Sequence, residues 1–428
     1  MHLRFIILTA FWFLSLQIGL AQRPMHLTLA EADKLAIQNN PQFTAAKFTA
    51  AAAYQIPAEY RSNLAPTVYS SLTGVGADTG SRLAAGGLNN PVVYNRFGSG
   101  LSISQLISDF GRTNNLVASA KLHAQAQDQV TETTRADILL ATHRFYFGVL
   151  RAQAVLKVAE QTVAARQLVA DQVTALAQSK LKSALDVSFA NVNLADAKLL
   201  LVGAQNDLKA SQAQLGTAMG LPNETSFLLD EEPLPGFLPD RIDPLIQEAV
   251  KSRPELANLR LEESSAKRFA QAEHDLYFPT IGVIGTAGFV PAGEATIPGR
   301  YGAVGLNVTI PIFNGGLFKA RQTEAELRAK AAGQNISDLE NRFARDVRVA
   351  LLNATTGQDR LALTAQLLQQ AELALDLAQT RYNLGLSSIV ELSQAQLNLT
   401  SAEIASASAK YDYQTQRSEL EYQIGALR

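Results

Sequence analysis

The sequence predicts an internally duplicated α+β membrane protein with long helical hairpins and four β-strands in each chain. Three observations predict this class. Matching segments recur about 205 to 213 residues apart, so that Leu181 corresponds to Leu386 and Asp186 to Glu391. Two segments of about 70 residues lack strong helix breakers, although a globular helix usually has about 12 residues. Short Gly-rich segments alternate apolar residues with small or polar ones, as β-strands do.

Residues 1–21 have the features of a secretory signal peptide. His2 and Arg4 precede an apolar run, and Gly19-Leu20-Ala21 supplies small residues for cleavage. We therefore expect export from the cytoplasm. A retained membrane helix is the alternative, but the apolar run is short for a helix that spans a bilayer. The chain has no cysteine, so neither a disulfide nor a thiol-linked lipid anchor is expected.

The first structural repeat is predicted over residues 22–222. Thr28-Leu29-Ala30-Glu31 has the spacing of a capping box, which indicates the start of a helix. Pro41 begins a second helix that is predicted to run to about Leu64. A β-hairpin follows at about 67–107, and two long helices follow the hairpin over 111–219.

A Pro-rich connector is predicted at 223–240, and the second structural repeat at 241–428. Arg253-Pro254 mirrors Asn40-Pro41 at the start of a helix. The second β-hairpin is predicted at about 280–313, and the second pair of long helices at 316–425. The chain is thus predicted to contain the same order of elements twice: short helices, a β-hairpin and two long helices.

The returning long helix of each repeat carries two heptad patterns of apolar residues. In the first repeat, one pattern consists of Leu185, Val192 and Leu199, and the other runs from Val187 to Leu215. The two patterns lie on opposite flanks, so the helix requires a neighbour on each side. A closed ring of helices provides two neighbours for every member. Burial inside an ordinary helical bundle is the alternative.

The four predicted strands, at about ten residues each, have the length that crosses a bilayer at a tilt. Four strands cannot close a barrel, and an open sheet edge is not tolerated in lipid. Three chains would supply twelve strands, enough to enclose a channel, and a trimer is therefore expected if the strands span a membrane. A soluble antiparallel sheet with one packed face is the alternative.

Two motifs carry a resemblance to a known family: Tyr382-x-x-Gly385-x-x-Ser388-x-x-Glu391-Leu392 and Pro311-Ile312-Phe313-Asn314-Gly315-Gly316. With the signal peptide and the paired halves, they resemble the TolC family of outer-membrane efflux proteins over about 25–428. The resemblance implies a homotrimer with a 12-stranded β-barrel in the outer membrane lipid and a helical tunnel, or α-barrel, in the periplasm. An equatorial belt that includes the connector would surround the tunnel, and a periplasmic adaptor protein would join the tips to an inner-membrane pump.

The resemblance also implies roles for residues at the two turns between long helices. The turns would close the tunnel as a periplasmic gate, in which Tyr382 bonds the carboxylate of Asp186 and Glu391 narrows the entrance. Ser387 replaces an arginine of the family's closed-state lock, and Gln394 replaces a second acidic residue, so a weaker lock is expected. Tyr382→Phe is then expected to raise the resting conductance. The residues expected to dock the adaptor are Gly385, Leu386, Ser388, Leu181, Ser183 and Ala184.

No catalytic, cofactor or metal site is predicted. The five histidines lack metal-ligand spacing, and Asp109-Phe110-Gly111 has no accompanying kinase motif. The 37 basic and 39 acidic residues nearly balance, which argues against nucleic acid as a partner. The leading hypothesis is a passive exit duct for small molecules, and the outer-membrane component of type I protein secretion is an alternative. A secreted coiled-coil structural or adhesive protein without a pore, and a general diffusion porin, are alternatives of other classes.

Overall fold

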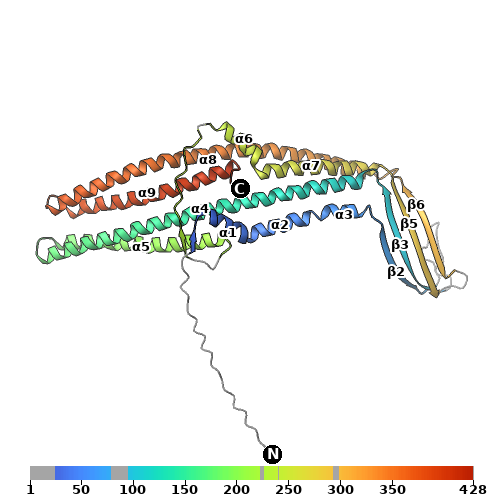
Figure 1. The fold of residues 1–428 in the computed structure, drawn as a ribbon, viewed down its shortest axis with the longest axis horizontal. Helices are drawn as coiled ribbons and strands as arrows, with labels where there is room; N and C mark the ends of the chain where they lie inside the picture. Colours follow the sequence, from blue (N-terminus) through green and yellow to red (C-terminus); the bar gives the residue numbers. More distant parts are fainter. Residues whose placement is uncertain (1–24, 79–94, 222–225, 240, 293–297, 428) are drawn as a thin grey trace, which may run out of the picture.

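The computed structural model describes residues 25–78, 95–221, 226–239, 241–292 and 298–427. The molecule is a long rod, with two helical hairpins at one end and a β-sheet at the other (Figure 1). The predicted signal peptide at 1–21 lies outside the described residues. So do residues 223–225 and 240 of the predicted connector.

Short helices, a strand pair and two long helices follow one another twice along the chain. The first repeat contains β1 (Met25–Leu27), α1 (Leu29–Asn39), α2 (Pro41–Ala53), α3 (Ile56–Ser62), β2 (Thr67–Val75), β3 (Arg96–Ser108), α4 (Arg112–Gln178) and α5 (Ala184–Ala218). The second contains β4 (Phe227–Leu229), α6 (Asp243–Ser252), α7 (Pro254–His274), a 3-10 turn (Asp275–Tyr277), β5 (Thr280–Ala292), β6 (Arg300–Thr309), α8 (Leu317–Asn383) and α9 (Ile389–Gln423).

The long helices match in length between the repeats. Helices α4 and α8 each contain 67 residues, and α5 and α9 each contain 35. At 1.5 Å per residue, α4 and α8 are each about 100 Å long. Helices α4 and α8 each run from the sheet to a hairpin tip (Figure 1).

The short helices differ between the repeats. A single helix from Pro41 to about Leu64 was predicted, but α2 ends at Ala53 and α3 begins at Ile56. Pro57 has no amide hydrogen to donate to the carbonyl of Ala53, so a continuous helix would lose a hydrogen bond there. Helix α7, which has no internal proline, is continuous over its 21 residues.

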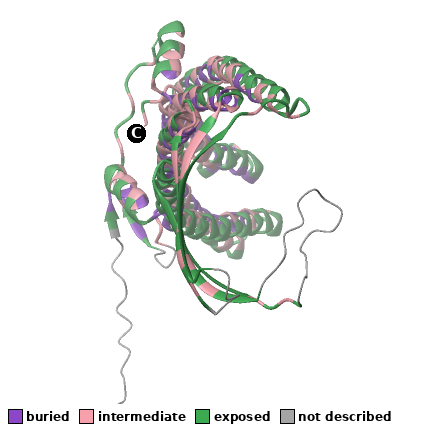
Figure 2. Ribbon diagram, turned by 90° about the vertical axis from the view of Figure 1, so that its right-hand side faces the viewer, coloured by how far each residue is buried: buried purple, intermediate pink, exposed green. Residues whose placement is uncertain are grey.

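Four antiparallel strands form the sheet, in the order β2-β3-β5-β6. One row across it joins Tyr69, Ser102, Thr286 and Ala303. Strands β2 and β6 are the two edges. Figure 2 shows the sheet largely exposed, whereas the buried residues gather among the helices.

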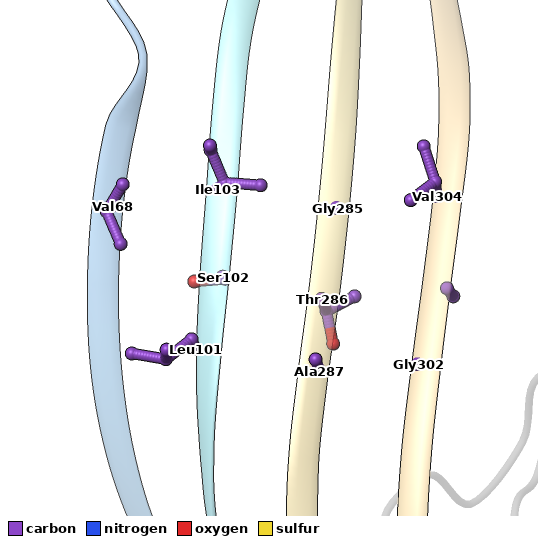
Figure 3. A pocket seen from close by; sticks show the side chains of 10 residues that line it. Val68, Leu101, Ser102, Ile103, Gly285, Thr286, Ala287, Gly302 and Val304 are labelled. Atoms are coloured by element: carbon purple, nitrogen blue, oxygen red, sulfur yellow. The ribbon is translucent and has the colours of Figure 1, made fainter.

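One face of the sheet is apolar. Val68, Leu101, Ile103 and Val304 project from it around Gly285, and they line a shallow trough of about 560 Å³ (Figure 3). The residues that alternate with them are mainly serine, threonine and glycine. An apolar face backed by a face of small and polar residues is typical of strands that have lipid on one side and water on the other.

The main buried core lies near the middle of the rod, where β1 pairs with β4 and both pack against α4. Tyr146 of α4 is fully buried there, and its hydroxyl donates to the backbone carbonyls of Leu27 and Asp230 at 3.1 and 2.8 Å. This core fastens the N-terminal strand and the connector to the long helices. A second core lies at the hairpin tips.

Candidate functional site

The residues singled out from the sequence lie in two turns, which we call tip 1 (residues 176–187, between α4 and α5) and tip 2 (residues 381–392, between α8 and α9). The tips lie at the end of the rod farthest from the sheet (Figure 1). Any molecule that passes along the rod from that end meets these turns first.

The two tips share one backbone conformation. In tip 1 the amide of Leu181 donates to the carbonyl of Leu176 at 2.9 Å, and in tip 2 the amide of Leu386 donates to the carbonyl of Arg381 at 2.8 Å. The residue before each of these leucines is left-handed: Lys180 has φ 62° and Gly385 has φ 74°. This pattern is a Schellman motif, which ends a helix by satisfying its last carbonyls.

The returning helices begin with different caps. Ser183 and Asp186 form a complete capping box at the start of α5, in which each side chain accepts from the other residue's amide. These hydrogen bonds, the backbone one first, hold the pKa of Asp186 below its ordinary value. In tip 2, Ser388 caps α9, but the carboxylate of Glu391 pairs instead with Arg381, at 3.0 Å between Oε1 and Nε.

Tyr382 belongs to the buried core at the hairpin tips. Its side chain is 6% exposed, and it packs with residues of both hairpins. The buried members of this core are Ala170, Val173, Ala190, Leu194, Tyr382, Ile389 and Leu392. The core therefore ties the two hairpins of one chain together just behind their tips.

The expected hydrogen bond between Tyr382 and Asp186 is not formed. The carboxylate of Asp186 instead accepts from the amide and hydroxyl of Ser183 at 2.9 and 2.8 Å. The buried hydroxyl of Tyr382 has no hydrogen-bond partner among the described residues. Burial raises the pKa of Tyr382, and the nearby charge of Asp186 raises it further. The amino group of Lys182 lies 4.0 Å from the centre of the Tyr382 ring.

Ser387 and Gln394, which the resemblance predicted to weaken the lock, make no hydrogen bond to Tyr382. The hydroxyl of Ser387 is buried and has no hydrogen-bond partner in the part of the chain that the structure describes. The amide of Gln394 donates to the side chain of Asn398, one turn along the same helix, at 2.9 Å. Neither residue links the two hairpins.

A polar seam continues behind the tips, between the hairpins. Asn193 donates to Ser393 at 2.7 Å, and the guanidinium of Arg166 donates to Gln396. Arg166 is 4% exposed, and burial lowers its pKa. Our sequence analysis missed Arg166 and Lys182. The signal for Arg166 was a lone cation among small and apolar residues, and for Lys182 it was a basic residue matched to Ser387.

The predicted docking residues all lie on the outside of the tips. Leu181 and Leu386 are 70% and 66% exposed, although both are leucines. Ser183, Ala184, Gly385 and Ser388 are also exposed. Apolar side chains exposed at the end of a rod favour contact with another protein. Among the described residues, no group of three or more His, Cys, Asp or Glu side chains could hold a metal ion.

Comparisons with known proteins agree on one family. The family described as "Outer membrane efflux protein" matches residues 34–221 and 245–426. The chain is 24% identical to outer membrane protein TolC of Salmonella enteritidis, over 94% of this chain and 83% of that protein. It is 26% identical to the alkaline protease secretion protein AprF of Pseudomonas aeruginosa, over 94% of this chain and 85% of that protein. The crystal structure of CusC aligns with a TM-score of 0.80 at 18% identity, over 93% of this chain and 92% of that one.

Proposed function

The chain belongs to the outer membrane efflux protein family, and we propose that three copies of it close into one passive duct for small molecules. The duct lies in the outer membrane, as the names of its relatives and structural neighbours indicate. The observation that carries the trimer is a four-stranded sheet whose edge strands, β2 and β6, have no partner within the described chain. Open edges are not tolerated in lipid, and three such sheets supply the twelve strands of a channel-sized barrel.

The contact between the two repeats suggests how neighbouring copies would meet. Helix α4 of the first repeat packs along α7 and α9 of the second. The hydroxyls of Ser119 and Ser265 lie 3.0 Å apart in this contact, and Asn258 donates to the carbonyl of Ala126 at 2.8 Å. Because α8 duplicates α4, we expect α8 of one copy to pack in the same way along α2, α3 and α5 of the next.

An unfilled hollow supports this arrangement. It has a volume of about 1040 Å³ and lies between α2, α4 and α5, where Ala45, Ala213 and Thr217 line it. In the duplicated half these three positions correspond to Asn258, Ser418 and Tyr422. Asn258, Ser418 and Tyr422 each hydrogen-bond to α4. The hollow is therefore the place that α8 of a neighbouring copy would occupy.

Of the two heptad patterns predicted on α5, the one that contains Leu185 is left without a partner in the part of the chain that the structure describes. Leu185, Val192 and Leu199 are exposed, although Leu194 and Leu215 of the other pattern are buried. Helix α5 is long and apolar enough to cross a membrane, but it packs along α4 as one arm of a hairpin. We therefore assign its exposed apolar flank to contact with the next copy.

The exposed tips would dock the hairpin of a periplasmic adaptor, which would join the duct to an inner-membrane pump. The duct itself would supply no energy, because the proposed transport is passive and the pump drives export. Protein secretion of type I is a second candidate, favoured by the match to AprF, a relative named for the secretion of alkaline protease.

Engineered cysteines test the trimer, because the chain has none of its own. Ala52 and Glu324 are both exposed, and they correspond by duplication to Ser265 and Ser119. In Ala52→Cys/Glu324→Cys we expect a disulfide between neighbouring copies. The expected products on a non-reducing gel are covalent dimers and trimers, with nothing larger. Ser119→Cys/Ser265→Cys is the matched control, because its disulfide should form within one chain and leave a monomer.

The cross-linked trimer should also conduct. Extracted from outer membranes and added to planar bilayers, it is expected to give discrete conductance steps. A ladder of products beyond three chains would contradict the closed ring. A soluble trimer that inserts into no bilayer would favour the coiled-coil structural protein instead.

A further inference from the structure

We propose that Lys182 of tip 1 is a positioning residue that holds tip 2 in place through the aromatic ring of Tyr382. The proposal rests on the duct function above and assigns the contact that keeps its periplasmic end closed. The family resemblance implies that closure depends on the tyrosine hydroxyl and on a basic residue in tip 2. In this chain the ring takes the place of the hydroxyl, and the basic residue comes from tip 1.

The geometry favours the ring over the hydroxyl. The Lys182 amino group lies 4.0 Å from the ring centroid, within the range of a cation–π contact. The hydroxyl has no hydrogen-bond partner among the described residues, and the carboxylate of Asp186 bonds Ser183 instead. The polar contact between the tips at Tyr382 is therefore made by the face of the ring.

The burial of the two partners strengthens this contact. Tyr382 is 6% exposed, and the side chains around it come from both hairpins. Lys182 is half-buried. A cation–π contact is worth more when water is excluded from it, because water competes for the ammonium group. Separating the tips would return the lysine to water and uncover the ring together with the tip core.

The duplication explains where the cation comes from. Lys182 of tip 1 and Ser387 of tip 2 occupy matching positions in the two turns. Tip 2 has the ring at Tyr382 and tip 1 has Ala177 at the matching position. One tip therefore supplies the cation and the other supplies the ring. The weaker lock that was expected from Ser387 is offset by Lys182.

Single-channel recording of the full-length protein in planar bilayers tests the proposal. Lys182→Met removes the charge while keeping a long apolar side chain, and we expect the open probability to rise about fivefold. Tyr382→Leu removes the ring and should raise it at least as much. Tyr382→Phe keeps the ring and should behave as the wild type, which reverses the expectation drawn from the resemblance. If the two side chains act through one contact, their effects should not add. Adding Lys182→Met to Tyr382→Leu should therefore raise the open probability less than Lys182→Met raises that of the wild type.

Lys180→Met is the matched control, because Lys180 lies in the same turn two residues away and is exposed. It should leave the open probability unchanged. If Tyr382→Phe raised the open probability as much as Tyr382→Leu, the hydroxyl and not the ring would hold the tips, and the proposal would be overturned. So would a Lys182→Met variant that records as the wild type does.

Hydrogen exchange of the purified protein separates this proposal from the duct function. Lys182→Met should speed amide exchange about fivefold in the peptide that contains Tyr382, and Lys180→Met should not. A wild type that never conducts would overturn the duct, whereas the exchange result would still decide whether Lys182 holds the tips. Equal exchange in Lys182→Met and the wild type would overturn the contact itself.

Discussion

Tip 1 and tip 2 follow the same backbone course and use different side chains. Both turns end their first helix with the same hydrogen bond between a leucine amide and a carbonyl five residues earlier. Tip 1 then has a complete capping box, a left-handed lysine and a cation directed at the other hairpin. Tip 2 has a left-handed glycine, an ion pair across the turn and a buried aromatic ring.

The difference shows which features of a duplicated turn are free to change. The Schellman hydrogen bonds satisfy carbonyls that have no partner within the helix that ends there, and both copies use them. The side chains have another constraint, because tip 1 packs against tip 2 and not against a copy of itself. A cation on one side and a ring on the other make a complementary pair, which two identical turns could not form.

Truncating a core side chain to alanine should destabilise tip 2 far more than tip 1. Leu392 is fully buried in the core, and its counterpart Val187 only borders it. We expect Leu392→Ala to lower the free energy of opening of tip 2 by about 2–5 kcal/mol, because a buried cavity remains. Val187→Ala should lower that of tip 1 by about 1 kcal/mol. Hydrogen exchange of the peptides that cover each tip measures both values.

Equal effects of these two substitutions would mean that the tips share the core evenly. In that case the difference in burial between Leu392 and Val187 would not explain how the two tips differ. Leu386→Ala is a suitable control, because this leucine is 66% exposed and should change the exchange of tip 2 little.

The left-handed positions should respond to substitution in opposite directions. Gly385→Ala adds a Cβ at φ 74°, and we expect it to destabilise tip 2 by about 1 kcal/mol. Lys180→Gly relieves the same strain at φ 62° and should stabilise tip 1 by up to about 1 kcal/mol. Hydrogen exchange of each tip again provides the measurement. A loss of stability in Lys180→Gly would show that the lysine side chain makes a stabilising contact that outweighs the strain.

Much of the fold could be predicted because it follows from local patterns and their repetition. The match of Leu181 to Leu386 located both turns, and the heptad patterns located the helices that return from them. Alternation located the strands, and the resulting sheet has the apolar face expected of it. The break after Ala53 is hidden by the alanine-rich helical pattern around it, although Pro57 lacks the amide hydrogen that a continuous helix would need there.

The contacts between the tips could not be predicted because they depend on side-chain positions in three dimensions. Lys182 and Tyr382 are 200 residues apart in the sequence, as are Asn193 and Ser393. Ser183 and Asp186 have the spacing of a capping box, and so do Ser388 and Glu391, so the local pattern does not indicate that Glu391 bonds Arg381 instead. The resemblance supplied a hydrogen bond for Tyr382, and this chain replaces it with a contact to the ring.

The capping box makes tip 1 sensitive to acid, and this is the smallest effect that we expect. Hydrogen bonds from Ser183 lower the pKa of Asp186 below its ordinary value of 3.8. A carboxyl group whose pKa is lowered by folding stabilises the folded state fully above that ordinary value. It loses this contribution as the pH falls through the lowered pKa. Protection of tip 1 from hydrogen exchange, corrected for the intrinsic rate, should therefore fall about twofold between pH 5 and pH 2.5, because a carboxylate near a helix N-terminus contributes only tenths of a kcal/mol.

Asp186→Asn is the control that assigns this loss to one carboxylate. Asparagine keeps the shape of the side chain and an oxygen that can accept from Ser183, but it does not titrate in this range. The protection of tip 1 in this variant should start lower at pH 5 and then stay level as the pH falls. If the variant and the wild type lost protection in parallel, the acid sensitivity would arise elsewhere, and the capping box would not distinguish tip 1 from tip 2 in the way that its hydrogen bonds suggest.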